Sequence, residues 1–152
     1  MDQTDGADQM ADQTGSVEGP RSLFEWRGDF SSPEVERLHS AGFARPEAPY
    51  DWWDQVQQNS FGWVCARVAG DLVGWVNVVW DGGTHAFILD TVVEARHRRR
   101  GIGAELVRVC VENARSAGCE WIHVDFDEPL RDFYLDSCGF APAPAGVINL
   151  MP

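Results

Sequence analysis

The sequence contains no lysine, so its twelve basic side chains other than histidine are all arginines. This absence excludes a lysine Schiff base and a lysine general base from the chemistry of the protein. Positive charge is scarce overall, because 24 acidic residues give a formal net charge of -12. A protein that binds nucleic acid or an anionic membrane surface needs a broadly positive field. We therefore expect neither partner.

Cysteine pairs and long apolar runs are also missing. The four cysteines lie apart in apolar surroundings without Cys-x-x-Cys spacing, which favours buried, reduced thiols and no metal site. They are Cys65, Cys110, Cys119 and Cys138. No stretch approaches the length of a membrane span, and the N-terminus lacks a basic segment followed by an apolar core. These absences predict a cytoplasmic protein.

Residues 1–20 carry five acidic side chains and almost no large apolar ones. Such a segment buries too little surface to offset the entropy that it would lose on ordering. We predict a disordered acidic tail at 1–20. Residues 21–152 are of ordinary size for one domain, and we expect a single domain there.

Hydrophobic periodicity and turn residues predict the order of the secondary structure. The expected strands lie at 23–26, 61–68, 72–80, 84–93 and 121–126, followed by two late strands at 140–142 and 147–150. The expected helices lie at 31–42, 51–58, 102–117 and 129–139. Short turns make the second, third and fourth strands antiparallel. A helical crossover places the fifth strand parallel to its neighbour.

The most informative segment joins the 84–93 strand to the helix that follows it. It reads His97-Arg98-Arg99-Arg100-Gly101-Ile102-Gly103-Ala104, and four of the twelve arginines lie between Arg96 and Arg100. The first turn of a helix has free backbone N–H groups and partial positive charge, and glycine lets an anion approach them. Arginine adds donors suited to phosphate. An ordinary glycine-rich turn or a solvated basic run would look similar, so the segment alone indicates a site for a small polyanion.

Two motifs together resemble the GNAT superfamily of N-acetyltransferases. Residues 98–104 match the pyrophosphate-loop pattern Gln/Arg-x-x-Gly-x-Gly/Ala of that family, with Val93 eight residues before Gly101. Residues 133–140 match its second signature, an aromatic-Tyr helix that ends in Gly-Phe. The resemblance covers roughly residues 22–150. It implies an α/β (α+β) fold with about four helices and a mixed, mostly antiparallel sheet of six to seven strands, parallel and splayed at the fourth and fifth strands.

The resemblance implies acetyl-CoA as the co-substrate. The pyrophosphate is expected on the backbone amides of the loop, and the pantetheine arm is expected to pair like an extra strand with the end of the 84–93 strand. The residues that would bind it are Thr91, Val92, Val93, Arg98, Arg99, Arg100, Gly101, Ile102, Gly103 and Ala104.

The resemblance also implies direct attack of a primary amine on the thioester in a ternary complex. Tyr134 matches the general acid that protonates the leaving thiolate in the family. A backbone N–H of the fourth strand, at Val93, would polarise the carbonyl group. The alternative for Tyr134 is a half-buried tyrosine whose hydroxyl is simply hydrogen-bonded.

The sequence leaves several candidates for the general base. Some relatives have a glutamate where this chain has Phe87, so that route is absent. Strand alternation places His85, Phe87 and Thr91 on one face and Asp90 on the other, before any bulge. His85 is the first candidate because of its near-neutral titration, and Asp90 and Asp125 are alternatives. Each could be structural, and a water chain could take the proton.

The acceptor is expected to be the amine of a small molecule, with a peptide or protein N-terminus as the alternative. The Trp52-Trp53 pair is expected in the core beside the acceptor site, where Glu47, Asp51 and Asp54 would favour a cationic amine. A non-catalytic acyl-CoA sensor is a competing interpretation. Because relatives of the family often dimerise through late strands, a homodimer through 147–150 is also expected.

Overall fold

The computed structural model describes residues 19–152, so the prediction of a disordered tail at 1–20 falls almost wholly outside the described residues. The strands of the described chain are β1 (Ser22–Trp26), β2 (Gly62–Val68), β3 (Asp71–Trp80), β4 (His85–Val93) and β5 (Trp121–His123). The α-helices are α1 (Ser32–Gly42), α2 (Trp52–Asn59) and α3 (Ile102–Ser116). Shorter helices cover Ala95–His97 and Glu128–Leu130, and a π-helix covers Phe133–Ser137.

The five described strands form one sheet in the order β1-β2-β3-β4-β5. All neighbours are antiparallel except β4 and β5, which are parallel. This confirms the expected fold, including the parallel pair produced by the α3 crossover. The pairing of β4 with β5 runs only from His85↔Trp121 to Phe87↔His123. Beyond it, β4 continues to Val93 without a strand on that side.

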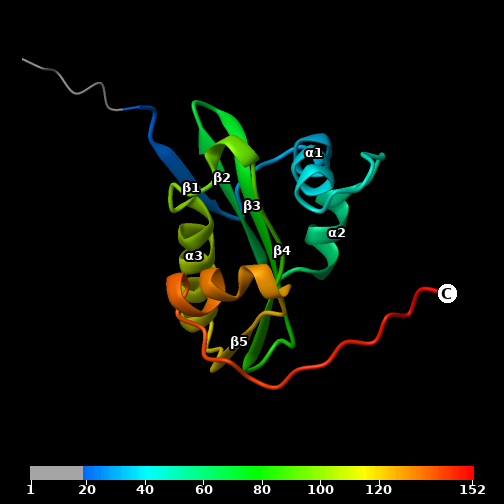
Figure 1. The fold of residues 1–152 in the computed structure, drawn as a ribbon, viewed down its shortest axis with the longest axis vertical. Helices are drawn as coiled ribbons and strands as arrows, with labels where there is room; N and C mark the ends of the chain where they lie inside the picture. Colours follow the sequence, from blue (N-terminus) through cyan, green and yellow to red (C-terminus); the bar gives the residue numbers. More distant parts are fainter. Residues whose placement is uncertain (1–18) are drawn as a thin grey trace, which may run out of the picture.

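The prediction of six to seven strands is wrong for the described residues. Segments 140–142 and 147–150 have no regular secondary structure, and β5 ends at His123 rather than at residue 126. Pro142 and Pro144 lack the N–H groups that a sheet ladder needs. The C-terminal segment runs away from the sheet (Figure 1), and Ile148 is 85% exposed.

Helices cover both faces of the sheet (Figure 1). α3 and the Phe133–Ser137 helix pack on one face, and α1 and α2 pack on the other. α3 buries a stripe with helical spacing, consisting of Ile102, Leu106, Val107, Cys110 and Ala114. The two faces therefore have separate apolar cores, and β4 contributes side chains to both.

A β-bulge interrupts β4 near its end. Trp75 lies opposite Val92 and Asn77 opposite Leu89, so Asp90 and Thr91 together face a single residue of β3. Asp90 adopts a positive φ of 58°. An extra residue reverses the side-chain alternation beyond it. Asp90 and Thr91 lie on opposite faces, as predicted, with Asp90 toward α1 and Thr91 beside Tyr134. Ala86 and Ile88 lie in the core on the α3 side, so the bulge puts Thr91 on their face and not, as predicted, on the face of His85 and Phe87.

The cysteines are all free thiols, as expected. Burial raises the pKa of Cys65 and of Cys110 to about 12. Cys119 and Cys138 are partly exposed, which corrects the prediction that all four are buried. Within residues 19–152, no helix has the length and apolarity to cross a membrane, and no group of three His, Cys, Asp or Glu residues is arranged to hold a metal ion.

Candidate active site

The basic glycine loop leads directly into the N-terminus of α3. Arg99 and Gly101 have positive φ values of 61° and 79°, and Gly101 is the N-cap of the helix. A Cβ atom at Gly101 would meet nothing within 4 Å, so glycine is needed here for its backbone angle and not for lack of space. The loop thus leads into a 15-residue helix whose N-cap makes no side-chain hydrogen bond, and the first N–H groups of a helix have no partner within it.

Gly103 links the two motifs that were recognised in the sequence. A Cβ atom there would lie 3.1 Å from the ring of Phe133, which shows how closely the start of α3 approaches the π-helix. Between the two glycines, the Ile102 side chain is buried in the core. Ile102 can therefore offer a ligand only its backbone amide.

The arginines of the loop differ in how they are paired. Arg96 contacts Glu94 at 3.1 Å, and this contact, ahead of the others, lowers the pKa of Glu94. Arg98 donates from Nε to the carbonyl oxygen of Val93 at 3.1 Å. Arg99 and Arg100 are exposed and make no ion pair with residues 19–152. Of the basic cluster, these two side chains are the ones available for an anion.

Tyr134 is buried in the core on the α3 side of the sheet, beside Thr91 of β4. It is 5% exposed, and the rings of Phe126, Phe133 and Phe140 lie 4.8 to 5.9 Å from its own ring centre. Burial raises the pKa of its phenol, and interaction with the Thr91 side chain acts in the opposite direction. Tyr134 lies in the π-helix, a distortion that is frequent at functional sites.

Thr91 lies on the unpaired edge of β4. Its hydroxyl oxygen is buried and makes no hydrogen bond of standard geometry within residues 19–152. Buried hydroxyl groups without a partner are rare in folded proteins. Trp75 Nε1, on the other face of the sheet, is the second such atom in the described chain. The Thr91 hydroxyl thus has the Tyr134 side chain as its neighbour and keeps the capacity to hydrogen-bond a ligand group at the edge of β4.

His85 does not come near this region. It begins β4, six residues before Thr91, which is about 20 Å along an extended strand. Its Nδ1 is 2.8 Å from Nε2 of His123, whose ring stacks on Phe87. Asp125 follows the end of β5 and helps to raise the pKa of Tyr134. Among the predicted base candidates, Asp90 is the one that lies at the bulge, beside the open edge of β4, and its side chain points toward α1.

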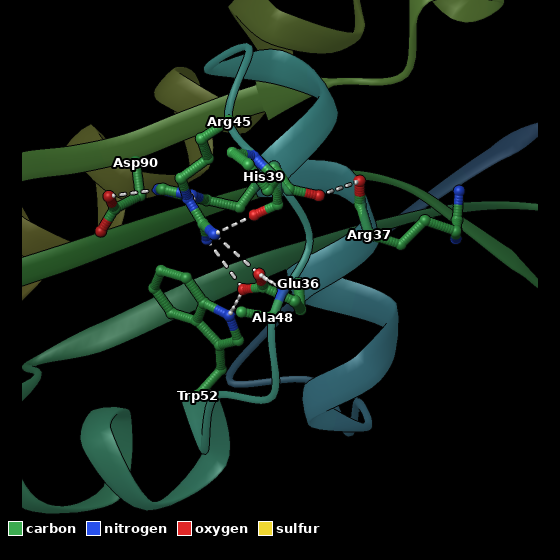
Figure 2. A network of polar contacts seen from close by, with 9 residues as sticks. Glu36, Arg37, His39, Arg45, Ala48, Trp52 and Asp90 are labelled. Carbon is green, nitrogen blue, oxygen red and sulfur yellow. Dashed lines mark hydrogen bonds and ion pairs between the residues drawn. The ribbon is translucent and has the colours of Figure 1, made fainter.

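Asp90 belongs to a polar network on the α1 side that the sequence did not predict (Figure 2). Its Oδ1 is 2.9 Å from Nε2 of His39. Nδ1 of His39 is 3.0 Å from Nη2 of Arg45, which holds Glu36 through two contacts of 2.7 and 2.8 Å. Glu36 also accepts from the indole of Trp52 and from a backbone N–H, each at 2.9 Å.

Glu36 is 3% exposed, and its pKa is lowered to about 2, first by the hydrogen bonds from Arg45. Asp51 accepts from the backbone N–H of Asp54 at 3.0 Å and so caps α2. Of the tryptophan pair, Trp52 is 5% exposed, but Trp53 is 36% exposed, which corrects the prediction that both are buried.

The chain belongs to the Acetyltransferase (GNAT) family, whose profile matches residues 22–140. This match confirms the family resemblance and includes the loop, β4 and Tyr134.

Curated relatives match over a shorter stretch. A segment of 59 residues is 42% identical to a probable glucosamine 6-phosphate N-acetyltransferase 2 of Oryza sativa subsp. japonica, and it covers 39% of this chain and 35% of that protein. A second rice protein, glucosamine 6-phosphate N-acetyltransferase 1, is 40% identical over 58 residues. The matched part of the chain thus spans about a third of the length of these relatives.

Solved structures share the fold over most of the chain. A putative acetyltransferase from Deinococcus radiodurans is 24% identical with a TM-score of 0.71, covering 85% of this chain and 88% of that one. Glucosamine-6-phosphate N-acetyltransferase from Arabidopsis thaliana is 16% identical with a TM-score of 0.70, covering 86% and 99%. An aminoglycoside acetyltransferase from an uncultured soil metagenomic sample is 19% identical with a TM-score of 0.70, covering 86% and 96%. At these identities, the likeness shows a common architecture.

Proposed function

We propose that the protein transfers the acetyl group of acetyl-CoA to the primary amine of a small molecule, by direct attack in a ternary complex. One observation carries this proposal. The start of α3, the unpaired edge of β4 and the buried Tyr134 phenol lie close together, since Gly103 approaches Phe133 and Thr91 lies beside Tyr134.

The residues present fit acetyl-CoA at both ends of this region. The amides of 99–104, with the side chains of Arg99 and Arg100, would hold the pyrophosphate. A cavity of about 340 Å³ opens beside this loop, along α3 and as far as Cys138. The pantetheine arm would lie along the open edge at 91–93, where the Thr91 hydroxyl makes no hydrogen bond of standard geometry in the described chain and lies beside Tyr134. When bound, the co-substrate supplies the activated acetyl group.

Arg98 affects how the pantetheine arm could pair with β4. Its Nε donates a hydrogen bond to the carbonyl oxygen of Val93, and this oxygen is one of the groups expected to pair with the pantetheine arm. A carbonyl oxygen can accept two hydrogen bonds, so the arm can pair with Val93 only from the side that Arg98 leaves open, or else at the Thr91 end of the edge. The backbone N–H of Val93 would polarise the thioester carbonyl group.

Tyr134 is suited to donate a proton to the leaving thiolate. The raised pKa of its phenol keeps the hydroxyl protonated near neutral pH. A protonated alkylamine has a pKa of about 10, so its free base costs about 4 kcal/mol at pH 7. The acceptor side must therefore hold an ammonium group and release its proton before transfer.

The relatives suggest the class of acceptor. The rice proteins are described as acting on glucosamine 6-phosphate, and some structural neighbours are aminoglycoside acetyltransferases. In this chain, the arginines of α1 and of the loop after it are paired: Arg37 with Glu94 and Arg45 with Glu36. A phosphate would have to compete with these carboxylates. We therefore place an unphosphorylated amine, such as an amino sugar, ahead of a phosphorylated one.

A thiol-release assay with purified protein and acetyl-CoA tests this function. The panel contains glucosamine, glucosamine 6-phosphate, an aminoglycoside, an amino acid and a peptide, with an amine-free control. Amine-dependent release of CoA supports the proposal, and a higher kcat/KM for glucosamine than for its 6-phosphate supports the acceptor class. Calorimetric binding of CoA without turnover of any amine would instead favour an acyl-CoA sensor.

A further inference from the structure

His39 is held in a single tautomer by its neighbours. The guanidinium group of Arg45 can only donate hydrogen bonds, and it faces Nδ1 of His39 from Nε at 3.3 Å and from Nη2 at 3.0 Å. Nδ1 must therefore accept, and the ring proton lies on Nε2. That proton is donated to Oδ1 of Asp90 at 2.9 Å. The contacts on its two nitrogens therefore make His39 a hydrogen-bond donor to Asp90.

The orientation of Arg45 is itself fixed. Glu36 accepts from both terminal nitrogens of Arg45, and its remaining capacity is used by the Trp52 indole and the Ala48 backbone N–H. A buried polar network in which every member is satisfied makes a rigid unit. The His39 ring also lies between Phe43 and Trp52, with ring centres at 4.4 and 4.6 Å. Figure 2 shows this chain of contacts leading from Glu36 through Arg45 and His39 to Asp90.

Asp90, the last residue in this series of contacts, keeps one carboxylate oxygen free. Oδ1 of Asp90 is taken by His39, and its Oδ2 makes no hydrogen bond within residues 19–152. The Asp90 side chain is 25% exposed, and it sits at the bulge one residue before Thr91. A negative oxygen is therefore presented next to the strand edge on which the acetyl group would lie.

We propose that Asp90 is the carboxylate that binds the substrate ammonium group and that His39 is a positioning residue, which holds Asp90 in place with Arg45 and Glu36 behind it. This inference rests on the proposed function and names the acceptor subsite of the same site. The free oxygen of Asp90 contacts the amine, and His39 acts only through Asp90. Neither residue contributes to the binding of acetyl-CoA.

Steady-state kinetics with the best amine of the panel tests this assignment. His39→Leu removes the donor to Asp90 and raises KM for the amine by about tenfold or more, because a hydrogen bond to a charged group is lost. KM for acetyl-CoA stays within about twofold of wild type. His39→Gln can place an amide N–H near the position of Nε2 and restores most of the affinity for the amine. Arg67→Gln, which breaks the ion pair of β2 with Glu34 on α1, is the matched control and leaves both KM values unchanged.

A double-mutant cycle separates positioning from a general structural effect. Asp90→Asn raises KM for the amine, and adding His39→Leu to it raises KM no further, because the two residues act as one unit. Additive effects of the two substitutions, or a rise in KM for acetyl-CoA as large as that for the amine, would overturn the proposal.

Nitrogen NMR of the histidine rings tests the His39–Asp90 contact without any turnover. If no amine is acetylated, the proposed function is refuted, and the NMR result still tests the positioning of Asp90 by His39. Long-range ¹H–¹⁵N spectra of the full chain are recorded, and His39→Gln assigns the signal. The Nε2–H tautomer in the wild type, weakened in Asp90→Asn, supports the arrangement. An Nδ1–H tautomer, or a His39 signal indifferent to Asp90→Asn, would refute it.

Discussion

Glu36→Gln is the sharpest test of the network behind the acceptor side. The substitution keeps the volume of the side chain but removes the charge that compensates Arg45, which contacts it at 2.7 Å. Glu36 is 3% exposed, but the Arg45 side chain is 35% exposed, so solvent can compensate part of the loss and the cost falls below the range of about 3 to 5 kcal/mol for a fully buried pair. We expect the free energy of unfolding to fall by about 2 kcal/mol in urea titrations at pH 7, the range of a hydrogen bond to a charged group.

The pH dependence of the same variant gives an independent check. The pKa of Glu36 is lowered from 4.5 to about 2 in the folded state, so its contribution is present above pH 4.5 and is lost as the pH falls toward 2. The difference in stability between wild type and Glu36→Gln should therefore shrink below pH 4.5. Glu112→Gln, at an exposed ion pair with Arg108, should cost less than about 1 kcal/mol. A similar cost for both variants, or a difference that does not vary with pH, would show that the network does not stabilise the fold as described.

Three further predictions concern the donor side. Tyr134→Phe should lower kcat by about a hundredfold while leaving the Kd of acetyl-CoA within about twofold of wild type, and unchanged turnover would remove Tyr134 from the mechanism. Gly101→Ala should cost about 1 kcal/mol of folding stability because alanine is strained at positive φ, and should raise the Kd of acetyl-CoA; calorimetry and thermal melts measure both effects. Arg99→Gln with Arg100→Gln should weaken acetyl-CoA binding most at low salt, whereas Arg67→Gln on β2 should not, and equal effects would argue against the loop as the anion site.

Local signals predicted most of the fold. The turn residues between β2, β3 and β4, and the apolar spacing of α3, depend on neighbours in the chain, and each of these elements forms within a few residues of its predicted bounds. The prediction of late strands was wrong because a run of apolar residues at 147–150 does not by itself provide a partner strand. The prolines just before it remove the donors that would recruit one.

The acceptor side could not be predicted in the same way. The bulge that turns Asp90 toward α1 follows from the pairing of β4 with β3, and no residue in 84–93 signals it. His39 and Asp90 are 51 positions apart. His39 resembled any residue on the inner face of a helix. Only the position of Arg45, which fixes the donor side of the histidine ring, gives His39 a defined role.

The contact between Arg98 and Val93 also affects the tendency of the free protein to aggregate. A strand whose backbone groups lack partners can template pairing with another chain, and β4 has such an edge from Ile88 to Val93. By covering the last carbonyl oxygen of that edge, Arg98 shortens the length on which a foreign strand could start to pair. The same guanidinium group also places charge there, which an incoming apolar segment would have to desolvate. The edge thus stays open to a ligand while being less able to start aggregation.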